Sequence, residues 1–146
     1  MKIIKSFKGK YFFLSNFYPV KIMYNGLVYL NSEAAFQAQK CITDNERIQF
    51  TTLNPSEAKR LGRSINLRPD WEQIKISVME DIVRCKFIQN DDLRKQLIDT
   101  KGMVLEEGNT WHDTFWGVDH ISRLGRNNLG TILMNIRNEF IKNDIV

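Results

Sequence analysis

The dipeptide Asn25-Gly26 is the feature that most constrains the fold, because it separates two short runs of apolar and aromatic residues at positions 20–24 and 27–30. Asn followed by Gly readily supplies the two positive φ angles of a type I′ turn, whose twist suits a pair of antiparallel strands. We therefore predict a β-hairpin in the N-terminal half of the chain.

A helix is expected directly after this hairpin. Asn31 and Ser32 offer side-chain oxygens that can cap the first turn of a helix running through Lys40. Glu33 then lies in that first turn, where the positive end of the helix dipole favours a carboxylate. The pattern predicts that Glu33 lies at a junction between a strand and a helix.

The rest of the chain predicts a mainly helical α+β domain. Apolar residues recur at three- and four-residue steps, most clearly at Trp71, Ile74, Val78, Ile82 and Cys85. Helices are expected at residues 55–62, 70–89, 92–100 and 129–140, and a short strand at residues 103–105. Residues 106–128 form a long irregular segment, which is often functional in a compact domain. We predict one domain over residues 1–146, with a small antiparallel hairpin sheet.

Length and composition favour a cytoplasmic protein that has no membrane partner. A chain of 146 residues can bury a core without disulfides or metal, and its apolar fraction of 42% is ordinary for a globular protein. No apolar run approaches the roughly 18 residues of a membrane span, and residues 1–10 lack the pattern of a signal peptide. Cys41 and Cys85 are too few and too far apart to suggest a disulfide framework.

The charge pattern favours a compact anionic ligand. The net charge is +4 and the pI is near 9.1, but the cations are spread along the chain with no polybasic block. Lys and Arg raise the local concentration of phosphates around a cleft. A phosphorylated small molecule therefore fits better than extended binding to nucleic acid.

Several common chemistries find little support in the sequence. His112 and His120 are eight residues apart with no cysteine pair nearby, so neither a metal nor another cofactor is expected. Residues 125–130 have the glycine spacing of a P-loop but lack the following Lys and Ser or Thr. Cys85 lies on an apolar helix stripe, where a thiol is more often a small hydrophobe than a nucleophile.

The residues that suggest chemistry each have a bland alternative. They are two carboxylates, two tryptophans and four cations: Glu33, Asp113, Trp71, Trp116, Lys40, Arg63, Lys75 and Arg137. A carboxylate in a first helical turn is more often a dipole partner than a catalyst. Trp71 could be the first core residue of its helix, residues 113–117 could be a simple turn, and Lys75 and Lys86 could extend to solvent from the edge of a buried face.

Read together, the segments resemble the YbiA-like/NADAR family in order and spacing across nearly the whole chain. The most specific pieces are Ser32-Glu33 followed by Phe36-Gln37, then Asp70-Trp71, and Asp113 followed by Trp116-Gly117. The matching segments are residues 13–19, 32–40, 58–63, 70–75 with 78–79, 86–90, 105–107, 113–117 and 125–137. Any one block is weak, but eight in the same order are specific.

This resemblance implies an N-glycosidase. Members of the family hydrolyse the bond between a phosphorylated ribose and a nitrogenous base, either in early riboflavin-pathway intermediates or in guanine carrying ADP-ribose. ADP-ribosylated nucleic acid is then a possible partner. The resemblance also implicates Glu33, Trp71, Asp113 and Trp116 in the activity.

Physical chemistry suggests a role for each residue type. A carboxylate beside C1′ stabilises the positive charge that develops on the sugar and activates water, so Glu33 is the expected catalyst. Asp113 could orient the water or the ribose hydroxyls, and Trp116 and Trp71 could stack on the base. The remaining predicted substrate-binding residues are Arg63 and Lys40 for phosphate, with Asn16, Lys75 and Asn128.

Two departures from the family leave the substrate open. Many relatives have His-Tyr directly after the motif glutamate, where this chain has Ala34-Ala35, and a glycine-rich stretch where it has residues 118–123. A second hypothesis is a non-catalytic module that binds NAD-derived or ADP-ribose ligands and senses them. A third is a protein in which the motifs only maintain the fold. Retention of both carboxylates, Glu33 and Asp113, favours the enzyme.

Overall fold

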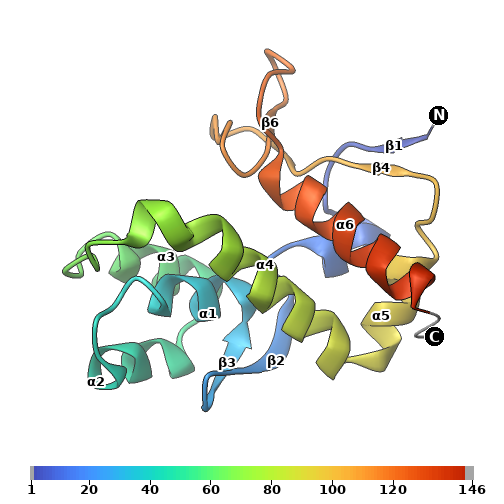
Figure 1. Ribbon diagram of the computed structural model, residues 1–146. Helices are drawn as coiled ribbons and strands as arrows, with labels where there is room; N and C mark the ends of the chain where they lie inside the picture. The colour runs from blue at the N-terminus through green and yellow to red at the C-terminus, as the bar shows by residue number, and fades with distance from the viewer. Residues whose placement is uncertain (1, 144–146) are drawn as a thin grey trace. The chain divides into compact units, whose positions relative to one another are not determined.

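The computed structural model describes residues 2–143, which pack into two compact units (Figure 1). Unit 1 is built from Met1–Ser15 and Asn90–Val146, and unit 2 from Asn16–Gln89. The single domain expected over residues 1–146 stays a prediction.

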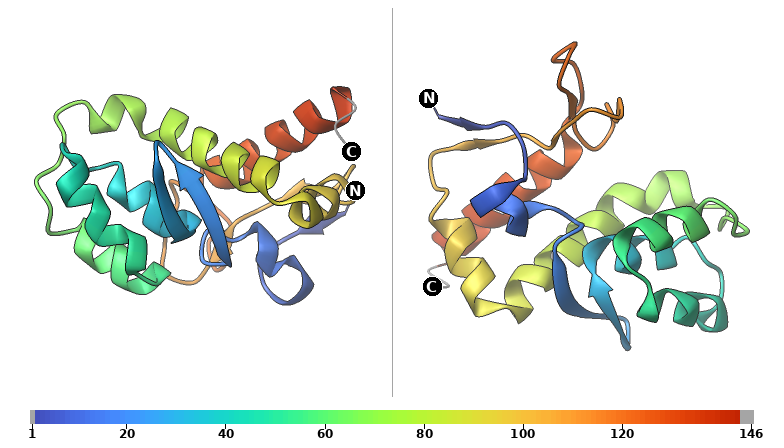
Figure 2. Two further views of the ribbon diagram at one scale, coloured as in Figure 1. Left: turned by 90° about the horizontal axis from the view of Figure 1, so that it is seen from below. Right: turned by 180° about the vertical axis from the view of Figure 1, so that it is seen from behind.

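Unit 2 begins with the predicted β-hairpin. Strands β2 (Pro19–Tyr24) and β3 (Leu27–Asn31) are antiparallel, with Ile22 opposite Tyr29 and a register shift near Pro19. Asn25 and Gly26 have φ angles of 49° and 86°, as the turn requires. The hairpin is seen from two further sides in Figure 2. Its prediction is confirmed.

Helix α1 (Ser32–Ala38) follows the hairpin and forms the centre of unit 2. Its N-cap is Asn31, whose Oδ1 accepts a hydrogen bond from the Ala34 backbone at 2.7 Å. Every residue of α1 is buried, and the helix packs against both hairpin strands and three helical segments of unit 2. The predicted cap and position of Glu33 are confirmed, although the helix ends two residues before Lys40.

Three short helical segments follow α1. Helix α3 (Pro55–Gly62) has the predicted bounds, with Pro55 in its first turn and a capping box between Asn54 and Glu57. Helix α2 (Asp44–Arg47) and the 3₁₀ helix η2 (Ile48–Thr52) were not predicted. They are too short for apolar periodicity to reveal, although Thr43 and Glu46 form a capping box at the start of α2.

Helix α4 (Trp71–Gln89) closes unit 2 within one residue of its predicted bounds, but its buried face differs from the predicted stripe. Ile74 and Cys85 are only half-buried, whereas Val83 and Phe87 belong to the core. Lys86 is 1% exposed, so the suggestion that it extends to solvent is wrong. Its position, one turn after Ile82 and Val83, faces the core rather than the edge of the helix.

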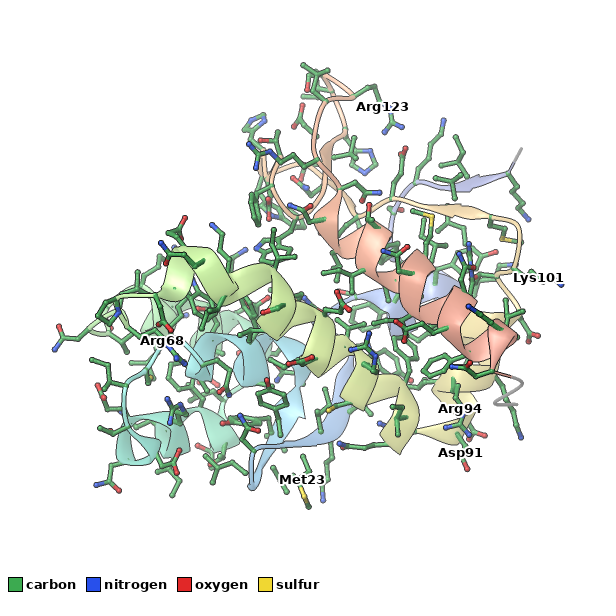
Figure 3. All side chains as sticks on the ribbon, in the orientation of Figure 1. Met23, Arg68, Asp91, Arg94, Lys101 and Arg123 are labelled. Carbon is green, nitrogen blue, oxygen red and sulfur yellow. The ribbon has the colours of Figure 1, made fainter. Side chains whose placement is uncertain are left out.

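Unit 1 contains two helices of the predicted kind and several two-residue strands. Its elements are β1 (Ile3–Ile4), the 3₁₀ helix η1 (Gly9–Leu14), α5 (Asp91–Ile98), β4 (Val104–Leu105), β5 (Gly108–Asn109), β6 (Val118–Asp119) and α6 (Asn128–Lys142). β1 pairs with β4 and β5 pairs with β6, both in parallel. The labelled side chains of Asp91 and Arg94 in Figure 3 form an ion pair at 2.8 Å in the first turn of α5.

The mainly helical α+β fold class is confirmed. Helix α6 buries every residue of its predicted apolar stripe, from Leu129 to Phe140. The strands of the described residues form sheets of two strands each, of which the hairpin is the longest. Within residues 2–143, no helix is long and apolar enough to cross a bilayer.

Candidate active site

Glu33 is a buried residue of helix α1 whose backbone and side chain both form hydrogen bonds. Its side chain and backbone together are only 9% exposed, and its N–H donates to the carbonyl of Asn16 at 3.1 Å. One turn further along α1, Gln37 Nε2 donates to Glu33 Oε2 at 2.7 Å. A buried carboxylate is costly unless hydrogen bonds or charges stabilise it, so its place in the central helix of unit 2 points to a functional role.

Lys40 lies near this carboxylate and near further cations. Burial lowers the pKa of Lys40, the charge of Glu33 opposes this shift, and the charges of Lys75, Arg63 and Lys59 add to it. Such charge effects require each of these groups to lie near Lys40. Within unit 2, Lys40 therefore has Glu33 on one hand and Arg63, Lys75 and Lys59 on the other as charged neighbours.

Two of these cations have further contacts. Lys75 pairs with Glu72, one turn earlier on α4, at 2.9 Å. Lys59 Nζ lies 6.0 Å from the centroid of the Phe17 ring, within the range of a cation–π contact. Arg63 follows the last residue of α3 and is exposed, so its guanidinium can meet a ligand from solvent.

Trp71 and Asn16 are packed into unit 2. The Trp71 ring lies 5.1 Å from the Phe36 ring at an interplanar angle of 53°, and Trp71 is 4% exposed. Asn16 Nδ2 donates to the Met79 sulfur at 3.4 Å. These contacts match the bland alternative for Trp71, a core residue at the start of its helix, while its predicted stacking on a base stays a prediction.

Asp113 organises a loop of unit 1. Its Oδ1 accepts hydrogen bonds from the backbone N–H groups of Phe115 and Trp116, at 3.0 and 2.9 Å. Asn109 holds Asp113 in turn, because its side chain accepts from the Asp113 N–H at 3.0 Å and donates to the Asp113 carbonyl at 2.9 Å. The turn proposed as an alternative for residues 113–117 is therefore present.

Trp116 and Asn128 lie where this loop meets helix α6. The carbonyl of Trp116 accepts from the N–H of Leu129 at 3.0 Å, and the carbonyl of Phe115 accepts from the N–H of Asn128 at 3.3 Å. The two aromatic rings of Phe115 and Trp116 meet edge to face at 4.8 Å. Asn128 Nδ2 is a buried donor with no hydrogen-bond partner among the described residues.

Sequence reasoning did not single out Asn109, which is 1% exposed and carries the loop of Asp113. Its side chain also donates to Glu107 Oε2 at 3.1 Å. A glycine at position 117 is needed beside this group, because a Cβ there would overlap Glu107 and lie 2.8 Å from Asn109 Nδ2. A lone Asn after Gly in an irregular segment carries no periodic signal, so only the structure identifies it.

Arg137 is a structural cation. Its guanidinium donates to the backbone carbonyls of Thr100 and Met103, at 2.9 and 2.8 Å. It ties helix α6 to the segment that connects α5 and β4. Its proximity to an apolar stripe therefore reflects packing within unit 1.

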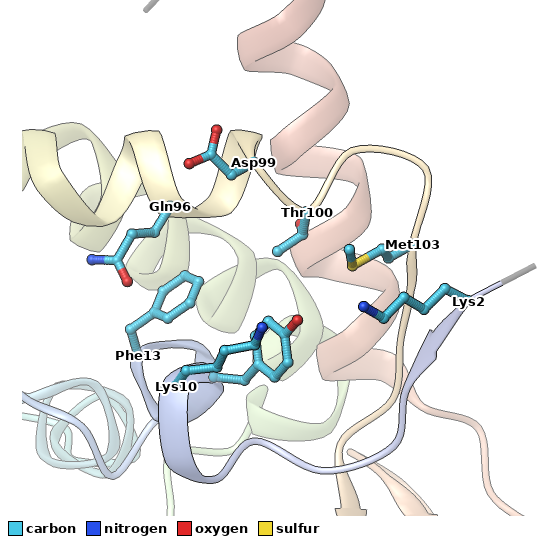
Figure 4. A pocket seen from close by; sticks show the side chains of 8 residues that line it. Lys2, Lys10, Phe13, Gln96, Asp99, Thr100 and Met103 are labelled. Atoms are coloured by element: carbon cyan, nitrogen blue, oxygen red, sulfur yellow. The ribbon is translucent and has the colours of Figure 1, made fainter.

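Unit 1 also holds a cavity of about 310 Å³ (Figure 4). It is lined by Lys2, Lys10, Tyr11, Phe13, Gln96, Asp99, Thr100 and Met103. None of the predicted site residues lies among them. Within residues 2–143, no group of three or more His, Cys, Asp or Glu side chains is placed to hold a metal ion.

The structure is an α+β protein whose unit 2 holds the buried carboxylate of Glu33 near Lys40. The family model of the NADAR domain matches residues 4–141, and the chain belongs to this family. The solved NMR structure of the Escherichia coli protein YbiA has the same fold. Its TM-score is 0.86 at 34% sequence identity, and the match covers 99% of this chain and 88% of that one.

Curated relatives agree with this assignment. The chain is 38% identical over 130 residues to the N-glycosidase YbiA of Escherichia coli, covering 86% of this chain and 79% of the relative. It is 34% identical over 131 residues to an N-glycosidase of Nostoc punctiforme, covering 86% of this chain and 83% of that protein. The predicted enzyme class is thereby confirmed: the chain is an N-glycosidase, a hydrolase of glycosidic bonds.

A riboflavin biosynthesis protein of Vibrio vulnificus is 42% identical over 132 residues. That match covers 87% of this chain but 35% of the Vibrio protein, so the chain spans about a third of that relative.

Proposed function

We propose that this N-glycosidase hydrolyses the bond between a phosphorylated ribose, or ADP-ribose, and a nitrogenous base. The observation that carries the proposal is the buried carboxylate of Glu33, held by Gln37 at 2.7 Å and close to Lys40, which has further cations as neighbours. The two kinds of charge suit the two ends of such a substrate. The carboxylate suits the cationic sugar carbon of the transition state, and the cations suit the phosphate.

Glu33 is proposed as the catalytic carboxylate. Breaking the C1′–N bond leaves positive charge on the sugar and moves the bonding electron pair to the base, which takes up a proton as it departs. A carboxylate beside C1′ stabilises the sugar and can accept a proton from the attacking water. General acid–base action of this kind contributes about 10²- to 10⁴-fold to a rate.

Lys40 and its cationic neighbours are proposed to bind phosphate. Arg63 is exposed and offers a planar fork that matches a phosphate with two parallel hydrogen bonds. Lys40 is half-buried, and because burial lowers its pKa, an incoming phosphate would favour its charged form. Lys75 lies near Lys40 and adds to the positive potential.

In unit 1, Asp113, Trp116 and Asn128 are proposed to contact the substrate. Asp113 Oδ1 is committed to two backbone N–H groups, so a role toward water or a ribose hydroxyl would use Oδ2. Asn128 Nδ2 is a buried donor whose partner a ligand oxygen could supply.

Two substrate classes share this chemistry. The riboflavin biosynthesis relative favours a phosphoribosylated intermediate of that route. ADP-ribosylated guanine is the other class that the family resemblance suggests. The chain has Ala34-Ala35 and the segment 118–123 where many members differ, and these positions are proposed to choose between the two.

The experiment is a turnover assay with both substrate classes. Purified protein is incubated with phosphoribosylated riboflavin intermediates and with an oligonucleotide carrying ADP-ribosylated guanine, and the free base is quantified by chromatography. We expect release from one class at least tenfold faster than from the other. Calorimetric binding of both probes without release of base from either would contradict the proposal and favour a sensor.

A further inference from the structure

We propose that Gln37 and Gly62 act together as a positioning pair for the Glu33 carboxylate, which rests on the function proposed above. In this arrangement Gln37 holds one carboxylate oxygen and Gly62 provides the space that lets Gln37 reach it. Neither residue belongs to the predicted site set. Both lie in unit 2, on the adjacent helices α1 and α3.

A short hydrogen bond joins the Gln37 amide to the Glu33 carboxylate. Glu33 and Gln37 are four residues apart on α1, so their side chains lie on one face of the helix. Gln37 Nε2 donates to Glu33 Oε2 at 2.7 Å, and Gln37 is 5% exposed. A short bond from an N–H donor fixes the direction of a buried carboxylate and favours its charged form.

The oxygen of the Gln37 amide is the end that does not face Glu33. The oxygen of Gln37, Oε1, is buried and accepts no hydrogen bond from the residues that the structure describes. Turning the amide over would bring this oxygen against the carboxylate, so Glu33 selects the orientation in which nitrogen faces it. The orientation that lets the amide donate to Glu33 thus leaves its oxygen without an N–H or O–H donor among the described residues.

Gly62 lies directly against the oxygen of the Gln37 amide. A Cβ built at Gly62 would overlap Gln37 Oε1 and lie 2.8 Å from Gln37 Cδ. The Cα–H bond that a Cβ would replace thus points at the amide oxygen, which makes a weak hydrogen bond possible there. Gly62 is buried in the last turn of α3 and needs no positive φ angle. Its requirement for glycine therefore comes from this close approach.

The pair also connects two parts of the proposed chemistry. Gly62 directly precedes Arg63, a proposed phosphate ligand, and Gln37 contacts the proposed catalytic carboxylate. A larger residue at position 62 would have to move the end of α3, or Gln37, or both. Misplacing catalytic groups by about 1 Å can cost roughly 100-fold in rate.

Gln39 provides a matched control within the same helical segment. It is 4% exposed, and its Nε2 donates to the carbonyl of Ala35 at 3.0 Å and lies 3.5 Å from the hydroxyl of Tyr29. Replacement of each glutamine by Met removes one buried amide of the same size, and Gln37→Met removes the hydrogen bond to the Glu33 carboxylate whereas Gln39→Met removes a bond to the Ala35 backbone.

The kinetic test compares Gln37→Met and Gln39→Met with the unsubstituted protein, on whichever probe substrate that protein hydrolyses. For Gln37→Met we expect kcat to fall about 10- to 100-fold with KM within about threefold. The acid limb of the pH–rate profile should move up by about one pH unit, because a carboxylate that loses a donor takes up a proton more readily. Gln39→Met should leave both kcat and the acid limb unchanged.

A second measurement needs no turnover. The side-chain carboxylate of ¹³C-labelled Glu33 is titrated by NMR in the same three proteins, and Gln37→Met alone should raise the titration midpoint. Gly62→Ala should resemble Gln37→Met in this titration if the protein folds. An unchanged midpoint in Gln37→Met would overturn the positioning pair whether or not a substrate is known, whereas failure of the proposed function would appear as no turnover by the unsubstituted protein.

Discussion

The two candidate carboxylates of this chain are held in opposite ways. Glu33 lies in a fully buried helix of unit 2 and receives a side-chain donor, Gln37, that contacts it at 2.7 Å. Asp113 lies in a half-buried loop of unit 1 and is itself the acceptor that shapes the loop, through two backbone N–H groups. The fold therefore positions the carboxylate of Glu33, whereas the carboxylate of Asp113 stabilises the conformation of its own loop.

The largest expected effect comes from Glu33→Gln. The amide oxygen of the new side chain can still accept from Gln37, but the negative charge is gone, so we expect kcat to fall about 10²- to 10⁴-fold. The melting temperature should change little. Kinetics on the hydrolysed probe and a thermal scan measure both, and an unchanged kcat would remove Glu33 from the mechanism.

Trp71 in unit 2 and Trp116 in unit 1 differ in burial, and we therefore expect different effects when each is replaced by Ala. Trp71 is 4% exposed against Phe36, so Trp71→Ala should lower the free energy of unfolding by about 3–5 kcal/mol. Trp116 is half-buried, so Trp116→Ala should be milder for stability and instead raise KM about tenfold through lost stacking on the base. Urea unfolding and initial-rate kinetics test the pair. Equal losses of stability in both variants would break the contrast.

A smaller effect distinguishes the two possible roles of Asp113. In Asp113→Asn the side-chain oxygen can still accept both backbone N–H groups, whereas in Asp113→Ala both bonds are lost. We expect Asp113→Ala to lower the free energy of unfolding by about 1–2 kcal/mol and Asp113→Asn to lower it much less. If Asp113→Asn is fully active, the carboxylate shapes the loop but does not act on the substrate.

A separate effect, on how stability depends on pH, concerns Lys86, a buried lysine of unit 2. Burial lowers the pKa of Lys86 to about 7, below its ordinary 10.5. Between pH 7 and about 9 the unfolded chain therefore binds more protons than the folded one, and Lys86 makes stability rise with pH. Lys86→Met should flatten this rise in urea titrations, while Lys21→Met, on the exposed side of β2, should not. An equal slope in both variants would contradict this account.

Two tyrosines, Tyr24 and Tyr29, set the highest pH at which the effect of Lys86 on stability can be measured by itself. Burial raises the pKa of Tyr24 and of Tyr29, so the folded chain keeps their protons at a pH where the unfolded chain loses them. Their contribution lowers stability as the pH rises through the ordinary tyrosine range near 10. The comparison of Lys86 variants is therefore made at pH 9 and below.

Much of unit 2 could be predicted because its signals are local. The Asn25-Gly26 turn, the cap at Asn31 and the start of α3 at Pro55 each depend on residues next to one another in sequence. The N-terminal position of Glu33 on α1 followed from the same signals. Short-range chemistry of this kind is available to sequence reasoning.

Contacts between distant segments could not be predicted. The parallel pairs of β1 with β4 and of β5 with β6 are two residues long and show no alternating pattern. Gly62 was interpreted as a helix stop, and α3 does end there, but its reason for being glycine is the approach of Gln37 from another helix. The burial of Lys86 likewise depends on which face of α4 meets the core.

The most direct test of the central claim is a crystal structure of the protein with bound ADP-ribose or ribose 5-phosphate, the sugar products of the two substrate classes. The account predicts that a Glu33 carboxylate oxygen lies within hydrogen-bond distance of the oxygen on the sugar C1′, with Gln37 still donating to Glu33 and a phosphate on Arg63 or Lys40. A product bound with its C1′ far from Glu33 would contradict the account.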